Sequence, residues 1–581
     1  MAKTISFWIE KIENAISLYH ITFLVFVGLI VYFRVFLNGF VWDDQDQIIN
    51  NPLIQHISNI PYFFTASTFT TGGSQLALAG AFYRPLMETV FSLVYVLWGL
   101  NPFGFHSFDI IVHIVNAILV FFFIKRILEL QKCQFSKAAA FASSILFLVH
   151  PANVESVAYI SATSEVMYSF FLLIALLTSM SFCSNEETSF IKLFLIFSAI
   201  LASLFSKESG VISIVLILIL TLLYFRNKFA PLAMASTLSL GVYSFFRFHI
   251  ATLSANQQLS PVPMAHASLG QRLLTIPYEL FSYLRLIFFP MSLHISQVDL
   301  ITRGTDYRFY LLLPIVLLIF TVLGIFCIKL KLITKLLLFF LLWFFVSIVI
   351  VLNIIPLDFT LEERWLYLPL IGVFGIVSLF IVKALNSRHP LNRIITICIL
   401  LVFFIAFSLR TMIRTFDWQN PLTLFSHDAV LSSNSAELLN NYGVALYTAG
   451  DHKRAKKEFI RALELAPDNL WTLNNLGSFY AQEGKYSQAR PLYEKSIQKS
   501  PTAAAYENLA QIYFLTESPL NTMNLLRQAL TIFPNSAKLN QLAALSSQAL
   551  SATNDAKMYA QKSLQLDQSQ DNINALRQFI K

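Results

Sequence analysis

Residues 104–126 read GFHSFDIIVHIVNAILVFFFIKR, a nearly unbroken apolar run that closes on a Lys–Arg pair. A bilayer core about 30 Å thick requires roughly 20 such residues in one helix. Similar runs, some of them slightly shorter, lie at 18–37, 137–150, 158–181, 190–206, 208–225, 230–250, 306–328, 333–352, 364–385 and 394–413. The sequence therefore predicts an all-α membrane bundle of about 11 spans.

The composition excludes an ordinary soluble protein. Of the 581 residues, 56% are hydrophobic and 13% are charged, and the mean hydropathy is +0.62. Soluble chains carry about 25% charged residues. The net charge of +8 comes from Lys and Arg in short loops and not from a basic tract with interleaved aromatic residues. We therefore expect no nucleic-acid partner.

Lysine and arginine are concentrated in four short loops, which predicts the orientation of the bundle. These loops lie at 125–137, 226–228, 329–335 and 383–393, and alternation of the spans puts all four on one side. Cytoplasmic loops carry the excess of Lys and Arg, so this side is the cytoplasm. Loop 38–82 contains neither residue type and lies outside, as does the chain after the last span. To keep this pattern, residues 85–100 must form a helix at the outer interface and not a further span.

The composition changes sharply after residue 414. Pro467, Pro501 and Pro534 recur at spacings of 34 and 33 residues, and small and aromatic residues precede each proline at matching positions. This pattern is typical of the tetratricopeptide repeat, in which paired helices touch through small side chains. We expect a membrane domain at 1–415 with an extracytoplasmic loop at 38–103, a linker at 416–435, and a solenoid of about four repeats at 436–581, the last one degenerate.

Ionisable residues gather at the outer ends of the spans, in five separate turns. A charge at the centre of a bilayer costs roughly 2.5–3.5 kcal/mol even on lenient scales, so such residues usually face a cavity or a partner. The turns hold Asp43 and Asp44, Arg84, His150 and Glu155, Lys207 and Glu208, and Glu362, Glu363 and Arg364. Together they indicate one polar site.

Simpler roles compete for several of these residues. Lys207 and Arg364 can snorkel to lipid phosphates. The carboxylates after the first span can cap a helix or solvate a loop. His150 and Glu155 are metal-ligand types, but two candidates do not make a metal site. We assign no metal ligand, and the requirement for a divalent metal stays open.

Several motifs follow one another in a fixed order. They are an acidic pair after the first span, Tyr-Arg-Pro-Leu at 83–86, His-Pro-Ala-Asn-Val-Glu-Ser-Val-Ala at 150–158, Lys-Glu-Ser-Gly at 207–210, Glu-Arg-Trp-Leu-Tyr-Leu-Pro at 363–369, and the closing repeats. With these motifs, nearly the whole chain resembles the transmembrane and tetratricopeptide-repeat-containing proteins of the GT-C glycosyltransferase superfamily. Residues 161–165, Ser-Ala-Thr-Ser-Glu, depart from the Arg-containing stretch expected in close relatives, which leaves the role of this turn open.

The resemblance implies an enzyme that takes a sugar from a polyprenyl-phosphate carrier and transfers it outside the membrane, commonly to a protein hydroxyl. Such a transfer needs a carboxylate to accept the hydroxyl proton. Asp43 is the first candidate, with Asp44 orienting it or taking the role itself. Cations stabilise the departing lipid phosphate, and the candidates are Arg84, Lys207 and Arg364. The supporting residues are His150, Glu155, Glu208, Glu362 and Glu363, of which the last two are expected to hold Arg364.

The repeats are expected to bind the acceptor or another partner protein. Asn441, Asn475 and Asn508 recur in register. Their amide groups suit the backbone of an extended peptide, although helix packing and solvation explain them equally well.

Two other functions remain open: a non-catalytic adaptor whose membrane part anchors the repeats, and a transporter or glycan-polymer ligase. The sequence does not determine the sugar, for which mannose is one candidate. Nor does it decide between protein Ser/Thr, lipid and glycan as the acceptor. The expected location is the bacterial inner membrane with the repeats outside, and the alternative is the endoplasmic reticulum with the repeats in the lumen.

Overall fold

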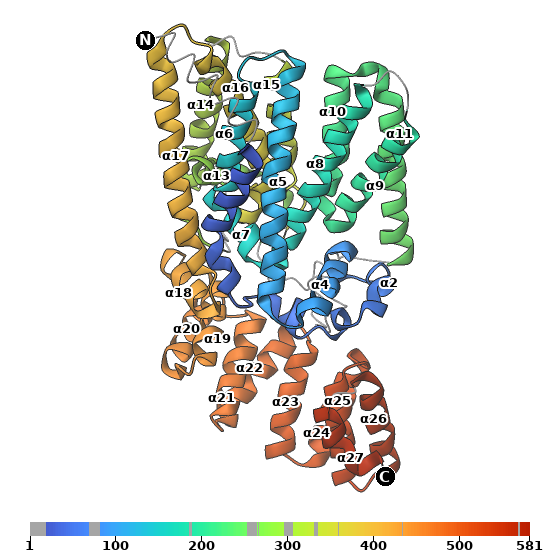
Figure 1. Ribbon diagram of the computed structural model, residues 1–581. Coiled ribbons are helices and arrows are strands. Elements are labelled where there is room, and N and C mark those ends of the chain that lie inside the picture. Colours follow the sequence, from blue (N-terminus) through green and yellow to red (C-terminus); the bar gives the residue numbers. More distant parts are fainter. Residues whose placement is uncertain are drawn as a thin grey trace. The chain divides into compact units, whose positions relative to one another are not determined.

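The computed structural model describes residues 19–68, 82–184, 189–251, 264, 267–295, 306–329, 335–357, 359–432, 434–567 and 570–580. The regular elements in these ranges are helices, as the sequence predicted (Figure 1). The chain divides into two compact units, Met1–His427 and Asp428–Lys581. The first unit contains the apolar helices, and the second contains the repeats.

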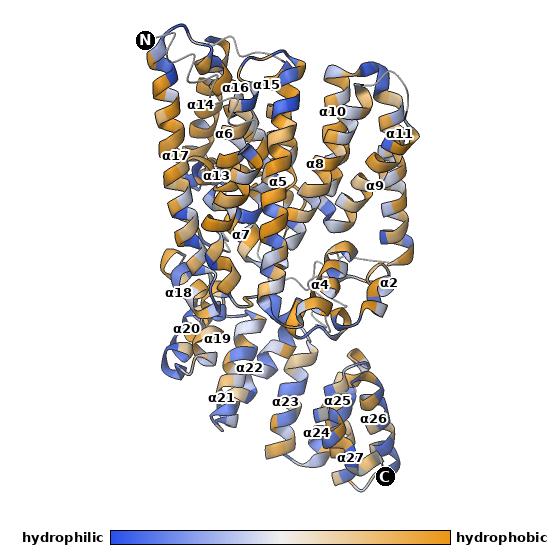
Figure 2. Ribbon diagram, in the orientation of Figure 1, coloured by the Kyte–Doolittle hydropathy of each residue, from blue (hydrophilic) through white to orange (hydrophobic). Residues whose placement is uncertain are grey.

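Helices of the first unit occupy the positions of the predicted spans. Among the described residues, six helical stretches are long and apolar enough to cross a membrane: Pro102–Leu130, Ile160–Cys183, Arg226–Ile250, Arg308–Lys329, Glu363–Leu385 and Pro390–Asp417. They correspond to α5 (Pro102–Leu130), α8 (Thr163–Cys183), α11 (Phe229–Phe245), α14 (Tyr307–Lys329), α16 (Tyr367–Leu385) and α17 (Pro390–Asp417), several of which are extended by short flanking turns. The other predicted spans are shorter apolar helices, at Tyr19–Val31, α9 (Phe190–Ser206), α10 (Val211–Tyr224) and α15 (Lys335–Val349), or a broken helix. In the broken helix, α6 (Ser136–Leu148) is followed at a bend of 52° by the stretch Pro151–Ala158, which ends in α7 (Val154–Ala158). Figure 2 shows hydrophobic residues along these helices and hydrophilic residues mostly near their ends.

Helix α4 (Pro85–Trp98) occupies the apolar stretch that was expected at the interface. Its 14 residues give a length of about 21 Å, which is too short to cross a hydrocarbon core of about 30 Å. Gly99 follows at φ +59, a left-handed conformation that glycine adopts without steric cost and that ends the helix. One face of α4 is buried, whereas Val96 and Leu97 are exposed.

Among the described helices of ten or more residues, two were not predicted. Helix α13 (Leu269–Phe288) lies outside every apolar run, because it is amphipathic, carries Glu279 among other charged residues and has Pro277 in its interior. Helix α18 (Pro421–Leu431) lies in the stretch expected to be a linker. Asn420 accepts a hydrogen bond from the backbone of Thr423 at 3.0 Å and so starts α18.

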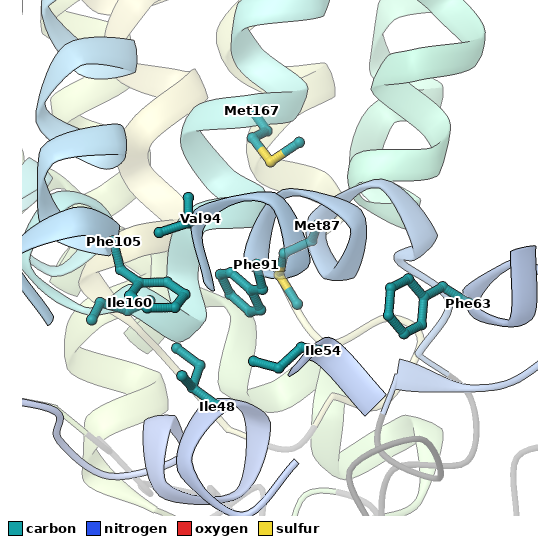
Figure 3. Packing of buried hydrophobic residues seen from close by; sticks show 9 residues of the cluster. All are labelled: Ile48, Ile54, Phe63, Met87, Phe91, Val94, Phe105, Ile160 and Met167. Atoms are coloured by element: carbon teal, nitrogen blue, oxygen red, sulfur yellow. The ribbon is translucent and has the colours of Figure 1, made fainter. Parts of the chain in front are cut away.

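A cluster of buried hydrophobic residues holds the loop after the first span against α4 and α8 (Figure 3). Burying each such side chain contributes roughly 1.5–3 kcal/mol. The cluster therefore holds the backbone that follows the candidate carboxylates and the helix that follows Arg84. Its members are Ile48, Ile54, Phe63, Met87, Phe91, Val94, Phe105, Ile160 and Met167.

The hairpin between α9 and α10 is unusually close. Lys207 takes an extended conformation that ends α9, and one 3-10 turn, η8 (Glu208–Gly210), leads into α10. A Cβ atom on Gly210 would lie 2.3 Å from the carbonyl oxygen of Ser203. Only glycine permits this approach, which sets the position of Lys207 and Glu208.

The second unit contains four helix pairs and a final helix. The pairs are α19 (Ala436–Thr448) with α20 (His452–Leu465), α21 (Leu470–Gln482) with α22 (Tyr486–Lys499), α23 (Ala503–Thr516) with α24 (Pro519–Ile532), and α25 (Ala537–Ala549) with α26 (Thr553–Leu566); α27 (Gln570–Ile580) follows. A Cβ atom on Gly443 would lie 2.7 Å from the ring of Phe459, and one on Gly477 would lie 2.7 Å from the ring of Tyr493. The same small-to-aromatic contact therefore closes the first two pairs.

We expect Gly210→Ala to destabilise the first unit by about 1–3 kcal/mol, because the added methyl overlaps backbone that cannot move cheaply. The measurement is the melting temperature of the full-length protein in detergent. Gly241→Ala is the matched control, since a Cβ atom there meets nothing within 4 Å. Equal melting temperatures for the two variants would contradict the close packing of this hairpin.

Candidate active site

The turn at residues 159–165, between α7 and α8, holds the two carboxylates that follow the first span. The Tyr159 hydroxyl donates to Oδ2 of Asp43 at 2.7 Å. Ser161 donates to Oδ1 of Asp44 twice, from its backbone N–H at 2.8 Å and from its hydroxyl at 2.6 Å. These bonds join segments more than 110 residues apart in the chain.

The same turn reaches two further elements. The Thr163 hydroxyl lies 2.8 and 2.9 Å from the two carboxylate oxygens of Asp109, on α5. Glu165 forms an ion pair with Lys207, at the end of α9. Alternate residues of the turn thus contact the loop after the first span, α5 and the α9–α10 hairpin. This turn is the stretch whose role the sequence left open.

Asp43 and Asp44 differ in how their oxygen atoms are used. Asp44 is fully buried, and its second oxygen accepts from the backbone N–H of Val41 at 3.0 Å. Asp43 is partly exposed, and within the described part of the chain its Oδ1 accepts no hydrogen bond. Asp43 therefore has a carboxylate oxygen free to meet another molecule, whereas Asp44 holds the loop in place.

Burial perturbs both carboxylates. It raises the pKa of Asp44 to about 7, although the hydrogen bonds from Ser161 and Val41 lower it. It also raises the pKa of Asp43, while the Tyr159 hydrogen bond and the charge of Arg364 lower it. A carboxylate whose pKa lies above its ordinary value is a stronger proton acceptor once it is ionised.

Arg364 is the cation with the most contacts. Its guanidinium donates to both oxygens of Glu362, at 2.7 Å from Nε and 2.5 Å from Nη2. Glu155 accepts from the Arg364 backbone N–H at 3.0 Å and lies 3.6 Å from its Nε. The side chain nevertheless retains 16% of its exposure. Arg364 is therefore held in one orientation and is still accessible.

Two other cations lie at the same end of the bundle. Arg84 Nε lies 3.2 Å from Glu208, which also contacts Arg247 at 3.4 Å. Burial lowers the pKa of Lys207. The charges of Arg84 and Arg364 lower this pKa further, and the charge of Glu165 raises it. Arg84, Lys207 and Arg364 are thus close enough for their charges to interact, and each is paired with a carboxylate.

Glu363 and His150 lie apart from this cluster of contacts. Glu363 contacts Arg414 at 3.4 Å, so it is paired with a different arginine from its neighbour Glu362. His150 Nε2 lies 3.0 Å from the carbonyl oxygen of Ile287, and its Nδ1 accepts from the backbone of Ala152 at 3.2 Å. The Glu363–Arg414 contact joins the turn before α16 to α17, and the His150–Ile287 contact joins the turn after α6 to α13. These two residues therefore support the fold around the site.

No group of three or more His, Cys, Asp or Glu side chains among the described residues is arranged to hold a metal ion. The ring nitrogens of His150 are both used in contacts within the protein. Glu155 is likewise used by Arg364. The two candidates that the sequence suggested for a metal therefore have other roles here.

Sequence reasoning missed several residues that organise the site. Tyr159, Ser161 and Arg414 lie inside or next to apolar runs, and the first two show no local pattern. Arg414 is fully buried and also contacts Asp417 at 3.1 Å. One signal was available for Arg414: an Arg followed three residues later by an Asp at the end of a span is a helical ion pair.

The asparagines of the repeats are bonded to one another. Asn475 donates to Asn440 at 2.9 Å, and Asn508 donates to Asn474 at 3.0 Å. Asn441 accepts from Asn440 at 3.1 Å. The bonds from Asn475 to Asn440 and from Asn508 to Asn474 connect the first helices of successive pairs, whereas the Asn440–Asn441 bond lies within α19.

Comparisons with known proteins match both parts of the chain. Residues 434–500 match the tetratricopeptide repeat family. Protein O-mannosyl-transferase TMTC3 of Homo sapiens is 26% identical over 580 residues, which cover 90% of this chain and 61% of that protein. Protein O-mannosyl-transferase F38B6.6 of Caenorhabditis elegans is 26% identical, covering 76% and 62%. TMTC1 of Homo sapiens is 26% identical, covering 77% and 55%.

The chain therefore resembles the transmembrane and tetratricopeptide-repeat-containing proteins, as its motifs predicted. It spans 61% of the length of the first of these relatives.

The Lys207–Glu165 pair gives a direct test of this geometry. Glu165→Gln leaves a buried ammonium without its counter-charge, and we expect a destabilisation of about 3–5 kcal/mol. Adding Lys207→Met should restore most of the stability, because a neutral pair has no such desolvation cost. The measurement is thermal unfolding of the full-length protein in detergent.

The control is Glu129→Gln, which breaks the more exposed pair with Lys125 at 3.9 Å and should cost less than about 1 kcal/mol. A double variant as unstable as Glu165→Gln alone would show that the two side chains do not act as a pair.

Proposed function

We propose that the chain is a membrane glycosyltransferase that moves a sugar from a lipid-linked phosphate donor to a hydroxyl of an acceptor protein. One observation carries the proposal. Asp43 presents an unused carboxylate oxygen at the same end of the bundle as Arg84, Lys207 and Arg364. The names of the curated relatives support mannose as the sugar.

The chemistry follows from these groups. Asp43 accepts the proton of the acceptor hydroxyl while the hydroxyl oxygen forms its bond to the anomeric carbon of the sugar. The bond from that carbon to the phosphate oxygen breaks, and its electron pair leaves with the lipid phosphate. Arg84, Lys207 and Arg364 stabilise the charge that develops on this leaving group. In this scheme Asp44 holds the loop and takes no proton.

The existing ion pairs do not prevent phosphate binding. Arg364 spends two donors on Glu362, and a guanidinium has five. Lys207 has three donors, of which Glu165 uses one. The remaining donors can reach phosphate oxygens while the carboxylates keep the cations oriented, which is the arrangement that preorganised stabilisation requires.

The distribution of charge supports an extracytoplasmic site. Arg226, Lys228 and Lys383 lie at the opposite ends of their helices from Lys207 and Arg364. Loops rich in Lys and Arg stay in the cytoplasm. The same orientation applies to a bacterial inner membrane and to the endoplasmic reticulum, where the lumen is the equivalent side.

We assign acceptor or partner binding to Asn441, Asn475 and Asn508 in the repeats. Tetratricopeptide stacks present extended binding surfaces. The bonds from Asn475 to Asn440 and from Asn508 to Asn474 fix the orientation of each amide, which lowers the entropy lost on binding a peptide.

Asp43→Asn should lower kcat by about 10²- to 10⁴-fold, because the variant has no base for the acceptor hydroxyl. The measurement is sugar transfer by the purified full-length protein from polyprenyl-phosphate mannose, without an ion gradient. Asp46→Asn is the matched control, since Asp46 lies on the same segment and is bonded to Asn50 at 3.3 Å.

The possible results separate the alternatives. Full activity in Asp43→Asn would show that the base lies elsewhere. No transfer by the unaltered protein, with partner binding intact, would favour an adaptor. Dependence on an ion gradient would favour a transporter.

Asn475→Ala should raise KM for a protein acceptor several-fold and leave kcat unchanged, because it removes an amide from the surface of the repeats. KM for the lipid-linked donor should not change. Asn524→Ala is the matched control, an exposed asparagine on α24, the second helix of its pair. Identical KM values for the protein acceptor in the unaltered protein, Asn475→Ala and Asn524→Ala would contradict acceptor binding by the asparagines.

A further inference from the structure

The Tyr159 ring stacks against two indole rings. It stacks on Trp42 with centroids 5.4 Å apart and an interplanar angle of 13°, and on Trp418 at 5.4 Å and 29°. The side chain is fully buried. Its hydroxyl makes one hydrogen bond in the described part of the chain, to Asp43 at 2.7 Å. Stacking against the two indoles thus holds the ring that carries this hydroxyl, and Asp43 is the partner of the hydroxyl among the described residues.

We propose that Tyr159 is a positioning residue for the transfer reaction, which holds Asp43 ionised and turned so that its free oxygen meets the acceptor hydroxyl. This inference rests on the proposed function. No motif in the sequence marks Tyr159, and the role follows from the contacts of its ring and hydroxyl alone.

The same ring also fixes the nearest cation. The Arg364 guanidinium lies 5.4 Å from the ring centre of Tyr159 and 5.9 Å from that of Trp42. Cations are attracted to the faces of aromatic rings at such distances. Tyr159 therefore contacts both the base and a cation for the leaving group, and it sets the distance between them.

The backbone supports this reading. Trp42, directly before Asp43, has φ +53, a left-handed conformation that costs a non-glycine residue free energy. Stacking against Tyr159 compensates this cost, because it buries a large aromatic surface. The strained residue and the stacked ring together determine where Asp43 lies, and strain of this kind is concentrated at functional sites.

Several charges act on Asp43 from neighbouring elements. Burial raises its pKa, Asp46 raises it further, and Tyr159, Arg364 and Arg84 lower it. Asp44 is adjacent and adds a second carboxylate. Of the groups that lower the pKa, the Tyr159 hydroxyl alone makes a hydrogen bond with Asp43 in the described residues.

These contacts determine the direction in which the pKa of Asp43 changes when the Tyr159 hydroxyl is removed. A hydrogen bond donated to the carboxylate stabilises its ionised form. Without the hydroxyl the pKa of Asp43 rises, and a higher pH is needed before the base is available. The acid limb of the pH–rate profile must move upward.

The test is Tyr159→Phe in the full-length protein, with transfer from polyprenyl-phosphate mannose measured from pH 5 to 10. We expect the acid limb of kcat to move upward by about 1–2 pH units, the cost of losing one hydrogen bond to a charged group. Activity should recover toward high pH, and KM for the donor should change less than twofold. A purely structural role for the hydroxyl would lower activity equally at every pH.

Two further proteins keep the test decisive. Tyr32→Phe is the control, because Tyr32 is fully buried and its hydroxyl has no hydrogen-bond partner among the described residues; its profile should match the unaltered protein. Replacing Tyr159 by a fluorotyrosine keeps the shape and strengthens the donor, so the acid limb should move to lower pH. This second variant decides the question if Tyr159→Phe does not fold.

Failure of this inference is distinct from failure of the proposed function. The positioning role alone would be overturned by one combination of results. In it, the unaltered protein is active, Asp43→Asn is inactive, and the acid limb of the pH–rate profile is unshifted in both Tyr159 variants. Absence of transfer in the unaltered protein, or full activity in Asp43→Asn, would overturn both.

Discussion

Burying charge in a low-dielectric environment is energetically unfavourable, and the 159–165 turn offsets this penalty by pairing with buried charged groups. Its side chains pair with carboxylates and an ammonium group from the first loop, α5 and the α9–α10 hairpin. Each of these elements brings a group that would be unstable alone at this depth. The hydrogen bonds and ion pairs between these groups hold the polar end of the bundle together. They also bring together residues that are far apart in the chain.

The helices were predictable because their cause is local. A span needs about 20 apolar residues, and such runs are visible in the sequence. The assignment of 85–100 as a non-spanning helix came from the alternation of charged loops, and α4 has the expected short length. Helix α13 was missed because Glu279 and Pro277 interrupt its apolar pattern. Helix α18 was missed because its start depends on one capping side chain, Asn420.

The site was predictable in its ingredients and not in its pairings. Acids and bases at span ends stand out, since each has an energetic cost that demands a reason. Which carboxylate meets which cation depends on the tertiary fold: Glu155 and Arg364 are 209 residues apart. Tyr159 and Ser161 carry no charge, so nothing in an apolar run marks them. Their importance comes from the partners that the fold brings to them.

The cations of the site are never without counter-charge. Glu208 lies between Arg84 and Arg247, Glu165 faces Lys207, and Glu362 holds Arg364. An empty site is therefore close to electrically balanced, and the fold does not need a bound anion to tolerate these residues. In the proposed reaction, an entering phosphate uses the donors that these pairs leave unused. In the proposed reaction, the same balance lets the lipid phosphate depart without leaving isolated cations behind, which favours turnover over tight product retention.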